Sequence, residues 1–223
     1  RSGSDDGTAL LPAGAEWRYN DSGDDLGIAW RQADFDDTTW AQGPAPLGYG
    51  QEVSTEVSYG PDDQDKHLTT YFRTSFELPD RPAGIELRVR RDDGAVVYIN
   101  GTEVLRSGMP TGDVAATTAA DYAQDDGETW IEAELPGSVV APGTNVVAVE
   151  LHQTKPDSSD LLFDMEILSL DQAPAVADPP PANATRVIAW GDIGECGVAA
   201  PETAELLEQV QGSFLALGDI AYP

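Results

Sequence analysis

Short runs rich in β-branched and aromatic residues recur along this chain, and turn residues separate them. This pattern limits the possible folds more than any other feature of the sequence. The residue ranges of these runs are 15–20, 69–78, 85–91, 95–100, 102–105, 129–135, 145–153 and 161–168. No convincing amphipathic helix lies between these runs. The pattern therefore predicts a mainly β protein with an N-terminal β-sandwich, in which residues 41–66 and 107–127 are loops over the rim.

Two turns are predicted between these runs. Asn100-Gly101 separates VVYI from TEVL, and this dipeptide suits a two-residue hairpin turn that needs positive φ. A second turn is expected at Asp92-Asp93-Gly94, between IELRVRR and AVVYIN.

The composition changes sharply at residues 171–185, which contain Pro174 and the run Pro179-Pro180-Pro181. Consecutive prolines form a stiff, extended spacer, so a linker is predicted here between a β-sandwich at 9–170 and a second unit at 186–223. In the second unit, RVIAW, PETAELLEQV and SFLAL read as strand, helix and strand. They predict the first β-α-β unit of an incomplete α/β domain, with parallel strands.

The charge balance excludes several partners. The chain has 12 basic and 40 acidic residues, a formal charge of −28, and such a body repels nucleic acids. No apolar run approaches the roughly 18 residues of a membrane span. The single cysteine, Cys196, rules out an intrachain disulfide. The acidic, lysine-poor composition fits a secreted protein, extracellular or periplasmic.

Both strands of the second unit run into the same dipeptide, Gly191-Asp192 and Gly218-Asp219. Parallel strands end on one edge of a sheet, so the two carboxylates are expected to converge there. A bound metal would relieve their repulsion, and carboxylate oxygens suit Mg, Mn, Ca, Fe or Zn. The alternative is that both residues merely cap helices or form turns.

The stretches WGDIGECG and LALGDIAYP resemble the opening of the calcineurin-like metallophosphoesterases, in the purple-acid-phosphatase-like branch. The resemblance implies that Asp192 binds one metal, that Asp219 bridges two, and that Tyr222 is the phenolate ligand of a ferric ion. It also implies a secreted phosphoesterase that hydrolyses phosphate esters with Fe paired with Zn, Mn or Fe. The family's later Asn-His and His motifs do not occur before Pro223, so this fragment itself is expected to be inactive.

Within residues 9–170, FDDTTWAQGPAPLGYG and RRDDGAVVYINGTEVL resemble the galactose-binding-like jelly-roll modules attached to secreted bacterial hydrolases. The alternative function is therefore a carbohydrate-binding or adhesive accessory module without catalysis, with a polysaccharide as partner. The candidate sugar-stacking residues are Trp30, Trp40, Tyr49, Tyr59 and Trp130. These aromatic residues could equally be core or loop anchors. In a third alternative, the sandwich only shields or orients a catalytic domain.

Three acidic clusters could hold calcium at the rim of the sandwich: residues 62–65, Asp92-Asp93 and Asp125-Asp126. None has the spacing of a known calcium loop, and solvated acidic turns are the favoured interpretation. His152, at the end of a predicted strand, is expected to be an edge residue rather than a ligand.

Overall fold

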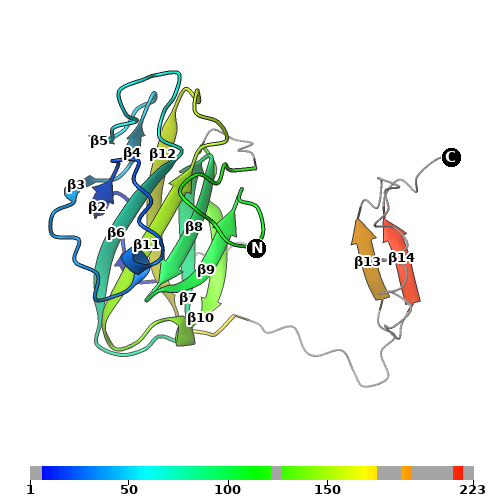
Figure 1. Ribbon diagram of the computed structural model, residues 1–223. Helices are drawn as coiled ribbons and strands as arrows, with labels where there is room; N and C mark the ends of the chain where they lie inside the picture. Colours follow the sequence, from blue (N-terminus) through cyan, green and yellow to red (C-terminus); the bar gives the residue numbers. More distant parts are fainter. Residues whose placement is uncertain (1–6, 122–126, 175–186, 192–212, 218–223) are drawn as a thin grey trace. The chain divides into compact units, whose positions relative to one another are not determined.

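The computed structural model describes residues 7–121, 127–174, 187–191 and 213–217. The protein is mainly β, and two sheets pack into a sandwich over most of the first 170 residues, as the sequence predicts (Figure 1). The chain divides into two units, residues 1–175 and residues 176–223.

Each layer of the sandwich has six strands. Sheet 1 contains β1 (Ala9–Leu11), β4 (Leu47–Tyr49), β5 (Thr55–Glu56), β7 (Gly84–Asp92), β10 (Ile131–Pro136) and β12 (Leu161–Leu170), and its main path runs β10-β7-β12-β4-β5. Sheet 2 runs β3 (Ala41–Pro44), β2 (Glu16–Asn20), β6 (Thr69–Leu78), β11 (Gly143–His152), β8 (Gly94–Ile99) and β9 (Thr102–Ser107). All strand pairs of these two sheets are antiparallel except β4 with β5. The described residues of this unit also form two short 3-10 helices, η1 (Ala29–Arg31) and η2 (Gly137–Val139).

All eight predicted runs form strands, but the prediction of residues 41–66 as loop alone is wrong. The short strands β3, β4 and β5 lie in this segment. Leu47 and Tyr49 of β4 are buried because β4 pairs with the start of β12, where Tyr49 lies opposite Leu161. Strands of two to four residues are too short to show a period, so only long-range pairing reveals them.

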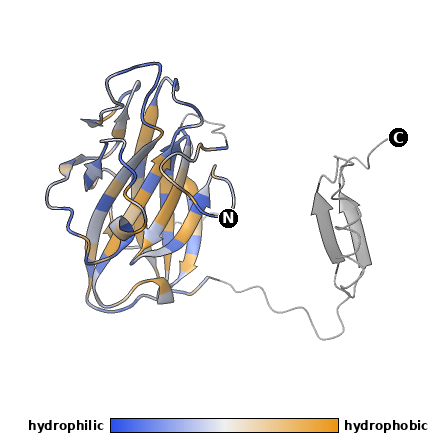
Figure 2. Ribbon diagram, in the orientation of Figure 1, coloured by the Kyte–Doolittle hydropathy of each residue, from blue (hydrophilic) through white to orange (hydrophobic). Residues whose placement is uncertain are grey.

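The main core fills the space between the sheets (Figure 2), and apolar residues alternate with polar ones along β7 and much of β12. Phe163 of β12 lies at its centre. Its ring stacks on Phe72 with centroids 4.4 Å apart and meets Trp17 edge-on at 4.9 Å. Side chains of both sheets therefore interdigitate, as expected for a sandwich.

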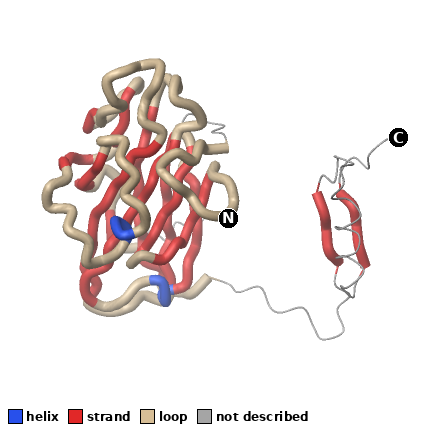
Figure 3. The backbone as a smooth tube through the Cα atoms, viewed as in Figure 1, coloured by secondary structure: helices blue, strands red, loops and turns tan. Residues whose placement is uncertain are grey.

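A second apolar cluster covers the outer face of sheet 2. Its buried members are Trp30, Tyr71, Val96, Tyr98, Met109, Ala120 and Ala148. Helix η1 carries Trp30 onto this face, and Figure 3 shows the surrounding loops against the strands. Because this cluster occupies only part of the face, the rest of sheet 2 is left with polar side chains around a groove.

The predicted hairpin turn is confirmed. Asn100 and Gly101 have φ values of 50° and 81°, and Ile99 pairs with Thr102 across the turn. Asn100 also anchors the turn, because its Oδ1 accepts a hydrogen bond from the Val146 N–H at 2.9 Å. The expected turn at 92–94 is instead the place where the chain passes from β7 in sheet 1 to β8 in sheet 2.

In the second unit, β13 (Val187–Gly191) and β14 (Ser213–Leu217) pair in parallel, as predicted. The register places Val187 opposite Ser213 and Gly191 opposite Leu217, so the two strands end level with each other. The predicted helix at 201–210 lies outside the described residues.

Candidate functional site: a groove on the outer face of sheet 2

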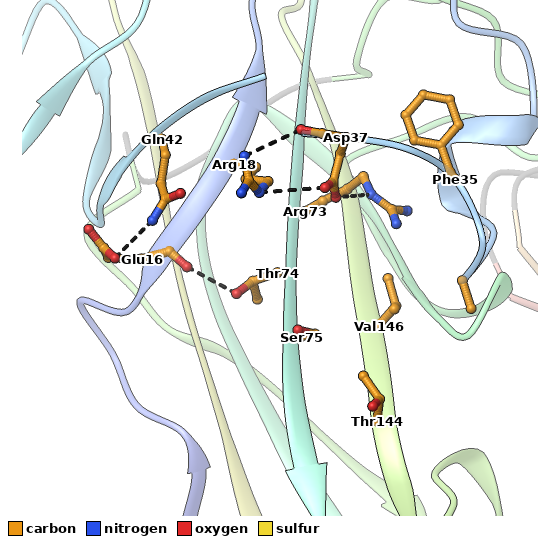
Figure 4. Close-up of a pocket in the computed structure, with 11 residues that line it drawn as sticks. Glu16, Arg18, Phe35, Asp37, Gln42, Arg73, Thr74, Ser75, Thr144 and Val146 are labelled. Carbon is orange, nitrogen blue, oxygen red and sulfur yellow. Dashed lines mark hydrogen bonds and ion pairs between the residues drawn. The ribbon is translucent and has the colours of Figure 1, made fainter. Parts of the chain in front are cut away.

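A groove of about 470 Å³ lies on the outer face of sheet 2, beside the second apolar cluster (Figure 4). Strands β2, β3, β6 and β11 and the loop after η1 supply its walls. The lining residues are Glu16, Arg18, Ala33, Phe35, Asp37, Gln42, Arg73, Thr74, Ser75, Thr144 and Val146.

Two arginines form the polar end of the groove. In β2, Arg18 follows Trp17, whose side chain enters the core, so Arg18 points to the opposite face. In β6, Arg73 follows Phe72, whose side chain enters the core, so Arg73 also points to the outer face. The register pairs Arg18 with Arg73 directly, and two like charges in that position repel each other.

Asp37 resolves this repulsion from the loop above the sheet. Its Oδ2 lies 2.7 Å from Arg73 Nε, and its Oδ1 lies 3.5 Å from Arg18 Nε (Figure 4). The preceding residue, Asp36, accepts hydrogen bonds from the Thr38 hydroxyl and N–H at 2.6 and 3.1 Å. These bonds hold the pKa of Asp36 below its ordinary value and fix the turn that presents Asp37.

Arg73 is the most deeply placed charge in the groove, since its side chain is only 3% exposed. Its Nη1 donates to the backbone oxygen of Trp30, which ties the sheet to η1. The guanidinium carbon also lies 5.4 Å from the centre of the Phe35 ring. Phe35 in turn meets Trp40 edge-on, with centroids 5.7 Å apart.

The opposite wall offers amide, carboxylate and hydroxyl groups. Gln42 Nε2 donates to Glu16 Oε2 at 2.9 Å, and the Thr74 hydroxyl donates to the Glu16 carbonyl oxygen at 3.0 Å. Ser75 and Thr144 line the same wall. With two arginines against Glu16 and Asp37, the lining is formally neutral, although the whole chain carries −28.

Two of the predicted sugar-stacking residues are not available to a ligand, which corrects their assignment. Trp30 is fully buried between Tyr71 and Tyr98, with centroids 4.7 and 5.9 Å away. Tyr49 is 3% exposed and packs on Tyr59 at 5.1 Å. Both residues anchor loops to the sheets, so neither presents a ring face to solvent.

The other three aromatic candidates are partly exposed, and their roles stay predictions. Trp40 borders the groove through its contact with Phe35. Trp130 lies beside Arg90, whose guanidinium carbon is 5.9 Å from the ring centre, and Tyr59 lies beneath Lys66 at 5.3 Å. None of these three residues lines the groove, so the structure does not bring them together there.

The acidic clusters differ in burial. Residues 62–65 are exposed and form a turn in which Asp62 Oδ1 accepts from the Gln64 N–H at 2.9 Å, as expected for a solvated turn. Asp92 and Asp93 are buried. Asp125 and Asp126 lie outside the described residues. The expectation that His152 is an edge residue is wrong, because β11 lies between β6 and β8 and His152 is fully buried, with Nδ1 2.9 Å from the Thr69 hydroxyl.

The predicted metal ligands Asp192, Asp219 and Tyr222 lie outside the described residues, so their role stays a prediction. In residues 7–121, 127–174 and the two strands of the second unit, no three His, Cys, Asp or Glu side chains gather so that they could hold a metal. No helix in the same residues is long and apolar enough to cross a membrane.

The sequence does not identify the residues that form the groove. Alternation within AEWRYN and TTYFRTSFEL indicates that Arg18 and Arg73 face away from the core. That signal does not reveal that β2 and β6 are neighbours, nor that a loop residue such as Asp37 lies between the two arginines.

No protein-family model matches the chain, and no curated protein matches it. Among solved structures, it is similar to a β-glucuronidase of Bacteroides uniformis, at 16% identity over 73% of this chain and 18% of that one, with a TM-score of 0.49. It is also similar to a Ruminococcus gnavus β-glucuronidase complexed with D-glucuronic acid, at 16% identity over 73% of this chain and 30% of that one, with a TM-score of 0.47. A third similar structure is a β-glycosidase of Bacteroides vulgatus, at 13% identity over 73% of this chain and 20% of that one, with a TM-score of 0.45.

The chain thus spans less than a third of the length of these three glycosidases, and with TM-scores below 0.5 no functional assignment rests on them. The expected assignment to the metallophosphoesterases and purple acid phosphatases is corrected. No model of either family matches the chain.

Proposed function

We propose that the β-sandwich is a carbohydrate-binding accessory module and that the groove on sheet 2 holds a neutral oligosaccharide. The observation that carries this proposal is the lining itself, which combines planar polar side chains, hydroxyl groups and one aromatic ring in about 470 Å³. Ligand sites typically combine a few fixed polar groups with apolar or aromatic surface.

The polar groups suit the hydroxyl groups of a sugar. Guanidinium, carboxylate and amide groups can each face two neighbouring hydroxyls, either as paired donors or as paired acceptors. The groove contains such groups in Arg18, Asp37 and Gln42. Arg18 is paired with Asp37, and Gln42 is bonded to Glu16, so these groups are held before a ligand arrives. Phe35 and Val146 supply the apolar surface that the C–H face of a sugar ring requires.

Charge supports a neutral ligand rather than an acidic one. The two arginines are already balanced by Asp37 and Glu16, and the body of the protein is strongly negative. An anionic polysaccharide would be repelled on approach, while a neutral one would not. The same acidic composition supports a secreted location, extracellular or periplasmic, which we include in the proposal.

The proposal is tested by screening the full chain on an array of neutral and acidic glycans, followed by calorimetry with the best neutral ligand. Phe35→Ala and Gln42→Ala should each raise Kd at least about tenfold, equivalent to about 1.4 kcal/mol. Trp130→Ala is the matched control, because Trp130 is partly exposed and lies outside the groove lining.

Two results would contradict the groove as the site. One is binding that survives both groove substitutions in folded protein. The other is binding that is lost in Trp130→Ala alone, which would move the site to sheet 1. A module that binds no neutral glycan at millimolar concentration would refute the function itself.

A further inference from the structure

Residues from four segments meet at one end of the sandwich, away from the lining of the groove. Tyr49 ends β4 and pairs with Leu161, so Asp160 lies just before that pair. Asp93 lies between β7 and β8, and Gln153 directly follows β11. Because His152 pairs with Gly94, Gln153 and Asp93 are brought together at the same end.

Two carboxylates at this rim are bonded only to neutral groups among the described residues. Asp93 Oδ2 accepts hydrogen bonds from the N–H and the hydroxyl of Thr154, at 2.7 and 3.0 Å. Asp160 Oδ1 accepts from the Ser159 hydroxyl at 2.7 Å, and its Oδ2 accepts from Gln51 Nε2 at 3.3 Å. Each carboxylate oxygen can accept more than one bond, so both groups can still take a ligand.

Two buried polar atoms beside these carboxylates have no hydrogen-bond partner in the described part of the chain. Gln153 is fully buried, and its Nε2 donates to the Asp160 backbone oxygen at 2.9 Å, while its Oε1 is unpartnered. The hydroxyl of Tyr49 is also buried and unpartnered. Such groups are costly to bury and normally bind something.

The surroundings of Tyr49 are negative. Burial raises the pKa of the Tyr49 hydroxyl well above its usual range, and the carboxylates of Asp160, Asp92 and Asp93 raise it further. Lys66 Nζ lies 5.9 Å from the ring centre and donates to the Ser158 oxygen at 2.6 Å, so a backbone carbonyl holds it.

We propose that Asp93, Asp160 and the Gln153 Oε1 atom bind a calcium ion at this rim. The set consists of carboxylate and amide oxygens, which are the ligands of hard cations. Calcium accepts irregular sets of six to eight oxygens that include backbone carbonyls, whereas magnesium needs a near-ideal octahedron. A cation there would supply the missing partner of Gln153 and offset the charge around Tyr49.

The experiment uses the full chain, stripped with EDTA, dialysed and then titrated with CaCl₂ at constant ionic strength. Calorimetry should give one saturable site, with Kd in the range of about 10⁻⁴ to 10⁻³ M that is usual for extracellular calcium modules. The melting temperature should rise over the same range, and MgCl₂ should act at least about tenfold more weakly. Constant ionic strength is essential, because any salt screens a chain of charge −28.

Variants locate the site. Asp160→Asn and Gln153→Leu should each raise the calcium Kd at least about tenfold, and Asp63→Asn, in the exposed acidic turn, should leave it unchanged. Gln153→Leu removes the unpartnered oxygen and should keep its fold in EDTA, so loss of calcium binding there is not loss of structure.

The proposal is overturned if calcium gives no saturable signal, or if MgCl₂ reproduces its effect. Calcium binding that persists unchanged in both rim variants would also overturn it. Persistence in those variants together with loss in Asp63→Asn would place calcium on the exposed turn instead.

Discussion

Removal of the Asp37 carboxylate by Asp37→Ala tests how the groove is built. The substitution leaves the Arg73 guanidinium, whose side chain is 3% exposed, without its counter-charge. Breaking one partner of a buried ion pair costs about 3 to 5 kcal/mol. Asp37 is itself 23% exposed, and Arg73 keeps its bond to Trp30, so we expect the lower end, about 3 kcal/mol.

For a chain of this length, about 3 kcal/mol corresponds to a fall in melting temperature of about 6 to 12 °C. The assay is urea unfolding of the full chain followed by tryptophan fluorescence, because Trp30 lies on the segment that Arg73 holds. Arg18→Met is the control. Arg18 is 35% exposed and 3.5 Å from Asp37, so its loss should cost less than about 1 kcal/mol.

The double variant Asp37→Leu with Arg73→Met separates the charge from the packing. If an uncompensated charge causes the loss, replacing both partners with apolar side chains should recover most of the stability. The reasoning is refuted if Asp37→Ala costs less than about 1 kcal/mol, or if the double variant is less stable than Asp37→Ala alone.

Three further predictions concern the sandwich. Phe163→Ala removes the ring between Phe72 and Trp17 and should cost about 3 to 5 kcal/mol in urea unfolding, whereas Phe163→Leu should cost less. Asn145→Ala should cost about 2 to 4 kcal/mol in the same assay, because its buried amide bonds both the N–H and the oxygen of Ala141. Burial raises the pKa of Asp164, so the charged carboxylate destabilises the fold at pH values above that raised pKa. This loss of stability disappears when the pH falls below 3.8, the pKa of the unfolded chain's carboxyl. Asp164→Asn keeps an Oδ1 acceptor for Gly14 and should therefore melt higher than the wild type at pH 7, with the difference closing as the pH falls towards 3.8.

The strands of the sandwich could be predicted from local patterns, which are alternation in strands such as β7 and β-branched runs bounded by turn residues in β8 and β11. In β7, for example, Leu87 and Val89 enter the core while Arg88 does not, and this period of two is visible without any neighbour. The turn at Asn100-Gly101 is equally local, since two positive φ values select these residue types.

The groove and the burial of Trp30 could not be predicted in this way. Both depend on a loop that folds back over sheet 2, and loop packing has no period along the chain. The pairing of Arg18 with Arg73 depends on residues that are 55 positions apart, and only the register shows it. Likewise Asp93 belongs to an acidic pair that resembles a solvated turn, and it is buried because the chain crosses between the sheets there.

The scarcity of basic residues connects the groove with the proposed cation site. The chain has 12 basic side chains for 40 acidic ones, and on sheet 1 one arginine serves several carboxylates. Arg88 contacts glutamates from three strands of sheet 1: Glu86, Glu132 and Glu166. In the groove the relation is reversed, and one carboxylate, Asp37, holds two guanidinium groups. At the rim, neither Asp93 nor Asp160 is paired with an arginine or lysine among the described residues. A divalent ion can therefore neutralise their charges there, as guanidinium groups neutralise carboxylates on the sheets. If that is so, calcium should stabilise the sandwich most at low ionic strength, where the repulsion between unpaired carboxylates is least screened.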